Sequence, residues 1–320
     1  YLFAHNDGDG GFGPDGDQDI IKCGSYTTDG SGNATVDLGW EPQFVITKKT
    51  SGTSAWNIWD TMRGWTNGSN YDYIAANSSA AETGNSNYGN PTSTGFTSNG
   101  VIGTNSNGIY IAIRRPTKVP ESATEVFNIS TRLSTSPRAY AGFAVDGFLR
   151  RNDINQTGDP YMAARITAGG LLTNSTAVEF SQGTDFFANS NGLFNGTGTA
   201  ETTDYYWMWK RAPNFFDVVA YTGLNSAMTV SHNLAAVPEM MWVKTRSTSD
   251  DWAVYHSALG NTDNLFLNAT NATASRIYWN NTTPTDTQFY LGDHSKVSAA
   301  NNYIAYLFAS LDGISKVGSY

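Results

Sequence analysis

Short runs of β-branched and aromatic residues, separated by Gly, Asn, Ser and Pro, recur along the whole chain. The clearest runs are residues 43–48, 109–113, 205–209, 240–244 and 303–308. Runs of this length, bounded by turn-forming residues, are typical of β-strands. No long window combines helical periodicity with a capping residue, and the best helical segment is long enough for one turn at most. The pattern predicts an all-β protein.

An internal repeat organises these predicted strands. Residues 36–48 resemble residues 230–244, and the same spacing then aligns Trp56 with Trp252. Matches that keep a constant spacing over such a long stretch are not expected by chance, so the repeat reflects a duplicated unit. Further matches pair residues 110–112 with 303–305 and, in a more divergent middle copy, residues 206–211 with 110–115.

The repeat predicts how the chain is divided. Each copy has about 95 residues, the size of a sandwich of about seven short strands, so we expect tandem β-sandwich or jelly-roll-like units arranged as beads. The expected segments are residues 1–19, the end of a preceding repeat with an acidic Gly/Asp loop; 20–118, unit 1; 119–211, the divergent unit 2; 212–309, unit 3; and 310–320, the start of a following repeat.

The two ends of the chain resemble internal segments. Residues 1–4 repeat residues 306–309, and residues 315–320 repeat residues 21–26. We therefore expect the chain to be part of a longer tandem array. The alternative is that the terminal strands complete the sheets of neighbouring subunits.

Composition and charge exclude several classes of partner. The chain has 19 Lys and Arg against 28 Asp and Glu, which gives a net charge of −9. A binder of nucleic acid or of anionic membranes needs a basic face, so we expect neither partner. The single Cys23 cannot form an internal disulfide, and no apolar run is long enough for a membrane-spanning helix.

No motif indicates catalysis, and we expect no enzymatic activity. Cys23 has Val218 and Val317 at the equivalent places of other copies, which is typical of a packing position rather than a reactive thiol. Glu41 and Glu239 recur beside the repeated prolines, where a structural role is favoured over a glycosidase pair. The four histidines have no metal-binding spacing.

The acidic loop near the start of the chain could hold calcium. Carboxylates separated by glycines can surround a hard cation with oxygen ligands. The alternative is an acidic loop in solvent, because the segment occurs once and lacks the length and terminal Glu of an EF-hand. The candidate ligands are Asp7, Asp9, Asp15, Asp17 and Asp19.

Two sets of aromatic residues suggest contacts. Trp65, Trp209, Tyr278 and Trp279 fall outside the clearest repeated positions and are candidates for stacking on a glycan, the alternative being core or inter-unit contacts.

The link between units 2 and 3 is short and contains Pro213, Phe215 and Phe216. A link this short cannot act as a flexible tether, so we expect these three residues to make a buried inter-unit contact within a semi-rigid rod.

Several segments resemble the repeated module of tail-fibre-like virion structural proteins of marine cyanophages and related ocean phages. The resemblance rests on residues 15–26, 38–43, 62–65, 211–223 and 252–260, and it weakens across residues 125–211. It implies a virion or extracellular location and transfers no catalytic residues.

The sequence therefore favours a non-enzymatic structural protein of a phage tail fibre or other extracellular filament, whose partners are adjacent repeats or further copies of itself. The alternative function is a carbohydrate-binding adhesin module that recognises a host-surface glycan. A polysaccharide-degrading enzyme is a third, minor hypothesis. We expect no cofactor other than the calcium considered above.

Overall fold

The computed structural model consists of antiparallel β-sheets joined by turns and a few short 3₁₀ helices, which confirms the all-β prediction. It describes residues 1–6, 16, 18–68, 71–86, 88–133, 136–152, 158–181, 184–194 and 204–320. The chain divides into two compact units, Tyr1–Lys118 and Val119–Tyr320. Across the parts of the chain that the structure describes, there is no apolar helix of membrane-spanning length.

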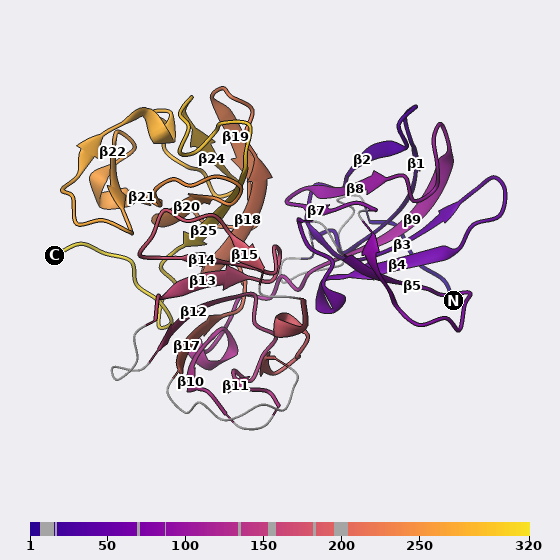
Figure 1. Cartoon of the computed structure of the whole chain (residues 1–320), viewed down its shortest axis with the longest axis horizontal. Helices are drawn as coiled ribbons and strands as arrows, with labels where there is room; N and C mark the ends of the chain where they lie inside the picture. Colours follow the sequence, from indigo (N-terminus) through magenta and orange to yellow (C-terminus); the bar gives the residue numbers. More distant parts are fainter. Residues whose placement is uncertain are drawn as a thin grey trace. The chain divides into compact units, whose positions relative to one another are not determined.

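The first unit contains one six-stranded sheet, in the order β1-β9-β3-β4-β5-β6, and a smaller sheet, β2-β8-β7 (Figure 1). Its core lies between the two sheets and includes Val45, Trp59 and Phe96. The strands are β1 (Ile21–Thr27), β2 (Asn33–Asp37), β3 (Pro42–Lys49), β4 (Trp56–Asp60), β5 (Tyr71–Ala75), β6 (Thr83–Ser86), β7 (Pro91–Thr92), β8 (Gly95–Asn99) and β9 (Asn107–Arg114).

The second unit contains two further six-stranded sheets, each accompanied by a two-stranded sheet. The first half orders its strands β10-β17-β12-β13-β14-β15, beside β11-β16. These strands are β10 (Phe127–Thr131), β11 (Ala139–Tyr140), β12 (Gly147–Asn152), β13 (Tyr161–Ala164), β14 (Gly169–Leu172), β15 (Phe180–Ser181), β16 (Gly192–Leu193) and β17 (Asp204–Trp209).

The second half of this unit orders its strands β18-β25-β20-β21-β22-β23, beside β19-β24. These strands are β18 (Phe216–Thr222), β19 (Met228–Ser231), β20 (Met240–Thr245), β21 (Ala253–His256), β22 (Asp263–Phe266), β23 (Ala274–Ser275), β24 (Gln288–Leu291) and β25 (Asn302–Phe308). If strands are counted within each sheet pair, every six-stranded sheet has the order first, last, third, fourth, fifth, sixth, so the strand order is the same in all three. We call the three sheet pairs the first, second and third repeats.

The strand registers correct one detail of the alignment between repeats. In β1, Cys23 stands opposite Ile111 of β9, and in β18 the equivalent Val218 stands opposite Tyr306 of β25. Ile111 is therefore equivalent to Tyr306, whereas the sequence match had placed it at Ile304. The error is two residues, and a shift of two leaves every side chain on the same face of the sheet.

The central strands of the sheets of the second and third repeats are buried on both faces. Along β25, Tyr303, Ala305 and Leu307 belong to the core beneath the β19-β24 sheet, whereas Ile304 and Tyr306 belong to a core shared with the second repeat. Along β13, Met162 lies in the same shared core. Alternate residues of one strand thus serve two different cores, as the two-residue period of a strand requires.

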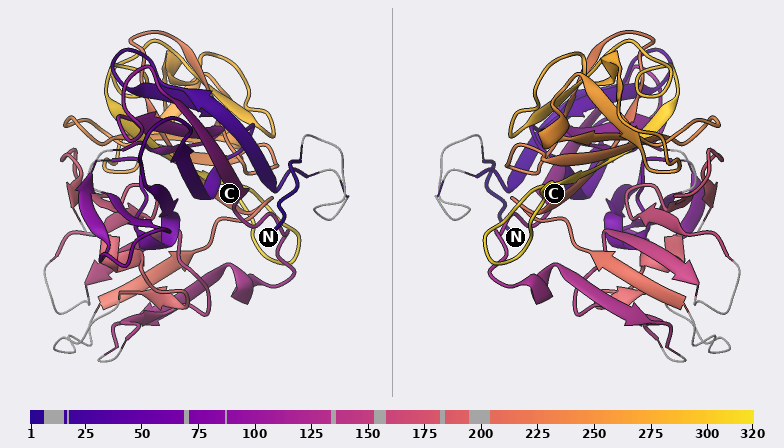
Figure 2. Two further views of the ribbon diagram at one scale, coloured as in Figure 1. Left: turned by 90° about the vertical axis from the view of Figure 1, so that its right-hand side faces the viewer. Right: turned by 90° about the vertical axis from the view of Figure 1, so that its left-hand side faces the viewer.

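These cores place four layers in one body. In Figure 1, the β19-β24 sheet, the sheet of the third repeat, the sheet of the second repeat and the β11 strand follow one another within the second unit. Figure 2 shows the third repeat (orange to yellow) above the second (magenta to salmon) from two further sides. The second and third repeats therefore form one layered body, whereas the sequence had led us to expect separate beads.

Candidate functional site

The second and third repeats contact each other through a hydrophobic cluster to which both contribute residues. It is formed by the faces of the two six-stranded sheets that turn away from their small sheets, and we call this contact the joint. Met162 and Leu171 come from the second repeat, and Ile304 and Tyr306 come from the third. All four side chains are at most 1% exposed. The joint is therefore a hydrophobic core in its own right, not a surface contact.

The two phenylalanines predicted at the inter-unit link lie in this joint. Phe216 is fully buried, and its ring centroid lies 5.2 Å from that of Phe308 and 6.0 Å from that of Trp209. Phe215 is 7% exposed, and Pro213 is also buried. Both phenylalanines belong to the hydrophobic cluster that joins the repeats.

A tight turn holds the link in place. The amide of Ala212 donates to the carbonyl of Phe216 at 3.0 Å, and the amide of Phe216 donates back at 3.3 Å. The same turn follows β25, where Leu311 and Ser315 exchange two backbone hydrogen bonds at 3.2 and 2.9 Å. The connection that leads out of the second repeat thus recurs at the end of the third.

A buried ion pair lies at the start of the third repeat. The Nε atom of Arg211 lies 2.6 Å from Oδ1 of Asp217, and the two residues are 7% and 0% exposed. The other oxygen of Asp217 accepts the backbone N–H of Asn233 at 2.8 Å, and the N–H of Arg211 donates to Asp146 of the second repeat at 2.8 Å. The pair is therefore hydrogen-bonded into both repeats.

Polar contacts continue along the joint beyond its apolar centre. Arg246 of the third repeat forms an ion pair with Glu179 of the second, with 2.8 Å between Nη2 and Oε2. The indole N–H of Trp252 donates to the carbonyl at the end of β14 at 2.8 Å. The ammonium of Lys244 donates to the carbonyl of Thr176 at 3.1 Å, and burial lowers its pKa to about 8. These contacts fix the two sheets in rotation as well as in distance.

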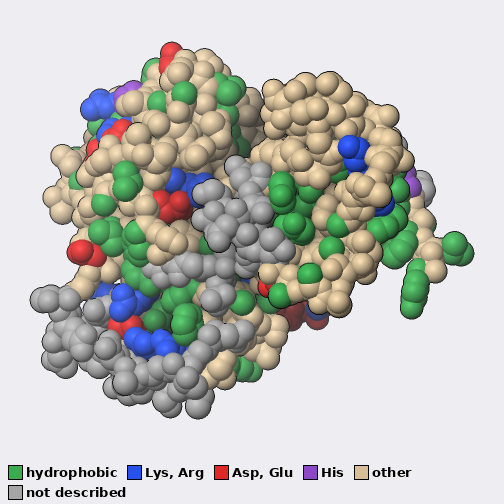
Figure 3. All heavy atoms as spheres, turned by 45° about the vertical axis from the view of Figure 1, so that its right-hand side comes forward, with side chains coloured by type: hydrophobic (Ala, Val, Ile, Leu, Met, Phe, Trp, Pro, Cys, Tyr) green, Lys and Arg blue, Asp and Glu red, His purple; other side chains and the backbone are tan. Residues whose placement is uncertain are grey.

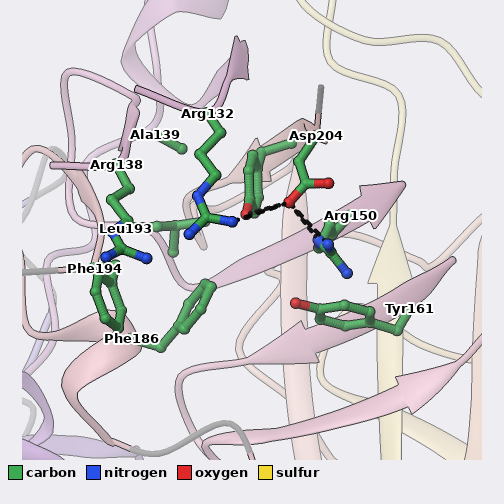
Figure 4. Close-up of a pocket in the computed structure, with 10 residues that line it drawn as sticks. Arg132, Arg138, Ala139, Arg150, Tyr161, Phe186, Leu193, Phe194 and Asp204 are labelled. Atoms are coloured by element: carbon green, nitrogen blue, oxygen red, sulfur yellow. Dashed lines mark hydrogen bonds and ion pairs between the residues drawn. The ribbon is translucent and has the colours of Figure 1, made fainter. Parts of the chain in front are cut away.

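A second candidate site is a cavity of about 140 Å³ in the second repeat, which we call the arginine pocket (Figure 4). Basic and aromatic side chains dominate its wall. The lining residues are Arg132, Arg138, Ala139, Arg150, Tyr161, Phe186, Leu193, Phe194, Asp204 and Tyr206. On the same repeat, Figure 3 shows Lys and Arg side chains gathered around an acidic one.

Asp204 organises the polar part of the arginine pocket. Its carboxylate is 2% exposed and lies 2.8 Å from Nη2 of Arg150 and 3.8 Å from Nη1 of Arg132. The hydroxyl of Tyr206 donates to the same oxygen at 3.4 Å, and burial raises the pKa of that hydroxyl. Three guanidinium groups against one carboxylate leave the described lining positive, although the chain as a whole is acidic.

The aromatic rings of the pocket lie against its arginines. The guanidinium of Arg138 lies 4.3 Å from the ring centroid of Phe194, and that of Arg150 lies 5.4 Å from that of Tyr161. A planar cation above an aromatic ring is a stable arrangement that presents N–H donors along its edge. Such a wall suits a ligand with a carboxylate or sulfate group and an apolar face.

The sequence did not identify this pocket, because its residues come from distant strands and turns. One signal was available: the second repeat contains six arginines, at positions 132, 138, 150, 151, 165 and 211. Such a concentration is unusual in an acidic chain, but the sequence alone does not show which arginines converge.

The predicted glycan-stacking residues are not a surface platform. Trp65 is 2% exposed and donates its indole N–H to the carbonyl of Gly89, and Tyr278 and Trp279 are at most 1% exposed. Trp209 is half-buried and packs in the joint. The stacking interpretation is wrong for the three buried rings, because a ring in the core has no face left for a sugar. The alternative, a structural role, describes them.

The predicted calcium loop falls mostly outside the described residues, which include none of Asp7, Asp9, Asp15 and Asp17. The carboxylate of Asp19 lies 3.3 Å from the ammonium of Lys22, which is an ion pair. Within the described ranges, no three His, Cys, Asp or Glu side chains are grouped so that they could hold a metal ion.

One family model matches this chain, over residues 18–116 and again over residues 103–320. The first match covers the first repeat, and the second covers the other two. No curated protein matches the chain. The matches together cover nearly the whole sequence, so the chain belongs to the DUF7483 family, described as a domain of unknown function.

Proposed function

We propose that this protein is a non-enzymatic structural protein, a building unit of a phage tail fibre or another extracellular filament. The observation that supports this proposal best is the joint. Two repeats share a hydrophobic core and a buried ion pair, so their relative orientation is fixed. A filament must resist bending, and repeats that bury their sheet faces on one another provide that stiffness.

Two further features agree with this proposal. The turn that leads from the second repeat into the third recurs after the third, so the same connection could lead into a further copy. The resemblance to tail-fibre-like virion proteins points to a virion or extracellular location. On this proposal, the partners are neighbouring repeats and further copies of the chain.

Mass spectrometry of purified virions, combined with electron microscopy, tests the proposal. We expect peptides of this chain in an abundant virion protein, and we expect that protein to form straight rods. Replacing Phe215 and Phe216 with Ser should make the rods bend or break, because the joint loses its central rings. A free monomer absent from virions would contradict the proposal, as would rods unchanged by the substitution.

The arginine pocket favours a second candidate function, a carbohydrate-binding adhesin module. Its arginines and aromatic rings suit an acidic sugar, because guanidinium groups bind carboxylates in pairs of hydrogen bonds while rings pack against the apolar face of the sugar. Fibres and adhesins are compatible, because the end of a fibre is where a host surface is met.

A glycan array that contains uronic-acid, sulfated and neutral sugars tests this second function. We expect binding to acidic glycans only, with Arg138→Ala reducing it at least tenfold. Arg276→Ala is the matched control, since Arg276 is exposed in the third repeat, and it should bind like the original chain. Absence of binding to every acidic glycan would exclude the adhesin function and leave the fibre proposal standing.

A further inference from the structure

The first repeat carries an apolar surface on its six-stranded sheet, on the face that turns away from the small β2-β8-β7 sheet. We call this surface the outer face. Five apolar residues stand side by side across it, one from each of five neighbouring strands. In order across the sheet they are Cys23, Ile111, Ile46, Ile58 and Ile74.

The rows on either side of this central row extend the outer face. Ile21, Ile113 and Phe44 stand side by side in one of them. Ile109 and Trp56, in the other, are 40% and 38% exposed. Hydrophobic side chains are visible on the surface of the first unit in Figure 3. An apolar surface that extends over several strands is typical of an interface.

The second and third repeats show what such a face binds. The equivalent central rows are also apolar: Ile129, Trp207, Leu149, Met162 and Leu171 in the second repeat, and Val218, Tyr306, Trp242, Val254 and Leu265 in the third. Met162 and Leu171 from one row pack in the joint with Val218 and Tyr306 from the other. In this chain, therefore, the face of one repeat is covered in part by the same face of another repeat, while Ile129 at the edge of the second repeat's row stays 52% exposed.

Two charged side chains in the described part of the outer face, Lys48 and Asp60, already have local partners. The ammonium of Lys48 donates to the carbonyl of Ser54 at 2.7 Å. The carboxylate of Asp60 accepts the backbone N–H of Arg63 and lies 2.6 Å from its guanidinium. Asp60 would thus be buried together with its counter-charge, and the ammonium of Lys48, which stands beside Trp56 in a flanking row, would keep a hydrogen-bond partner.

We propose that the outer face of the first repeat binds the outer face of a second copy of this chain. Within the described parts of the second unit, the central strands of the two equivalent faces already cover each other, so a second copy supplies a matching surface. A contact between two identical faces closes on itself and gives a two-fold dimer. It would join two chains side by side, and it does not depend on the fibre proposal, which concerns repeats in series.

Sedimentation velocity of the full chain over a range of concentrations tests this proposal. We expect a monomer–dimer equilibrium for the original chain. Ile111→Lys should raise the dissociation constant by roughly 100-fold, because it places a charge at the centre of the buried face. Ile277→Lys is the matched control, since Ile277 is 50% exposed outside any sheet, and it should dimerise like the original chain.

The single cysteine gives a second, independent measurement. Cys23 lies in the central row, so its alkylation by iodoacetamide should slow as the chain dimerises, and it should not slow in Ile111→Lys. Circular dichroism of Ile111→Lys should match that of the original chain, which separates loss of the dimer from loss of folding. A monomer at every concentration, or a dimer that Ile111→Lys leaves intact, would overturn the proposal.

Discussion

Arg211 and Asp217 form a buried ion pair across the link between two repeats, with 2.6 Å between Nε and Oδ1. In the first repeat the place of Asp217 is taken by Lys22, which pairs with Asp19 near the surface instead. The buried pair is therefore a particular feature of the link between the second and third repeats and not a property of every repeat. Its geometry makes the link sensitive to the loss of one charge.

Replacing Asp217 with Asn should lower the free energy of unfolding by about 3–5 kcal/mol, because the guanidinium of Arg211 would stay buried without its counter-charge. Guanidinium chloride denaturation followed by tryptophan fluorescence measures this change. Asp312→Asn, at an exposed position, is the control and should change it by less than about 0.5 kcal/mol. Equal effects of the two substitutions would show that the pair does not stabilise the joint.

Replacing Phe216 with Ala should lower the free energy of unfolding by about 3–5 kcal/mol, because a fully buried ring leaves a cavity between two sheets. Thermal and chemical denaturation both report this loss. Phe3→Ala is the comparison, since Phe3 is 54% exposed, and its effect should stay within about 0.5 kcal/mol. If the Phe216 variant were as stable as the Phe3 variant, the joint would not be a core.

His232 should make the third repeat less stable in acid. Its Nδ1 accepts the backbone N–H of Leu234, its Nε2 lies 3.2 Å from the carbonyl of Thr285, and burial lowers its pKa. The unfolded chain therefore binds a proton near pH 6.5 while the folded chain does not, so this contribution is complete above about pH 6.5 and is lost as the pH falls through the lowered folded pKa.

Denaturation at several pH values between about 7 and 5 measures this dependence. His232→Asn keeps an oxygen that can accept from Leu234 and cannot gain a proton, so its stability should fall less steeply than that of the original chain. His294, whose pKa burial also lowers, should account for part of the slope that remains. Identical slopes for the variant and the original chain would contradict this role of His232.

Lys244 should give a dependence of the same sign at high pH. Burial lowers its pKa to about 8 in the folded chain, so between about pH 8 and pH 10 the unfolded chain holds the additional proton and folding gains stability as the pH rises. Lys244→Met removes this titration. The stability difference between Lys244→Met and the original chain should therefore shift in favour of the original chain across that range, as paired denaturation curves would show. A constant difference would contradict it.

The fold class could be predicted from the sequence because it is a local property. Short runs of β-branched and aromatic residues and the turn residues between them each indicate the structure of a short segment. The match of Trp56 with Trp252 then shows that such segments recur. The equivalence of Ile111 in the first repeat and Tyr306 in the third was missed in the sequence alignment. Two alignments that differ by two residues place the same side chains on the same face of the sheet, so side-chain type alone does not distinguish them. The joint was foreseen only at its link, through Phe215 and Phe216, since face-to-face packing is a long-range property.

The candidate sites show where the sequence gives too little information. Trp65 and Trp279 are large aromatics near turns, and nothing in the neighbouring residues tells whether such a ring points inward. The arginine pocket brings together Arg132, Arg150 and Asp204 from different strands and turns, which only the folded chain places side by side. Composition could indicate that the second repeat is rich in arginine, but not that the arginines share a wall.

The central claim is that the second and third repeats form one cooperative body through the joint. Native-state hydrogen exchange, read by mass spectrometry, tests it by comparing β17 with β25. We expect equal opening free energies for the two strands, and we expect Trp252→Ala to lower both by the same amount although Trp252 lies in the third repeat. A loss confined to β25, with β17 unchanged, would show that the repeats unfold independently and would contradict the account.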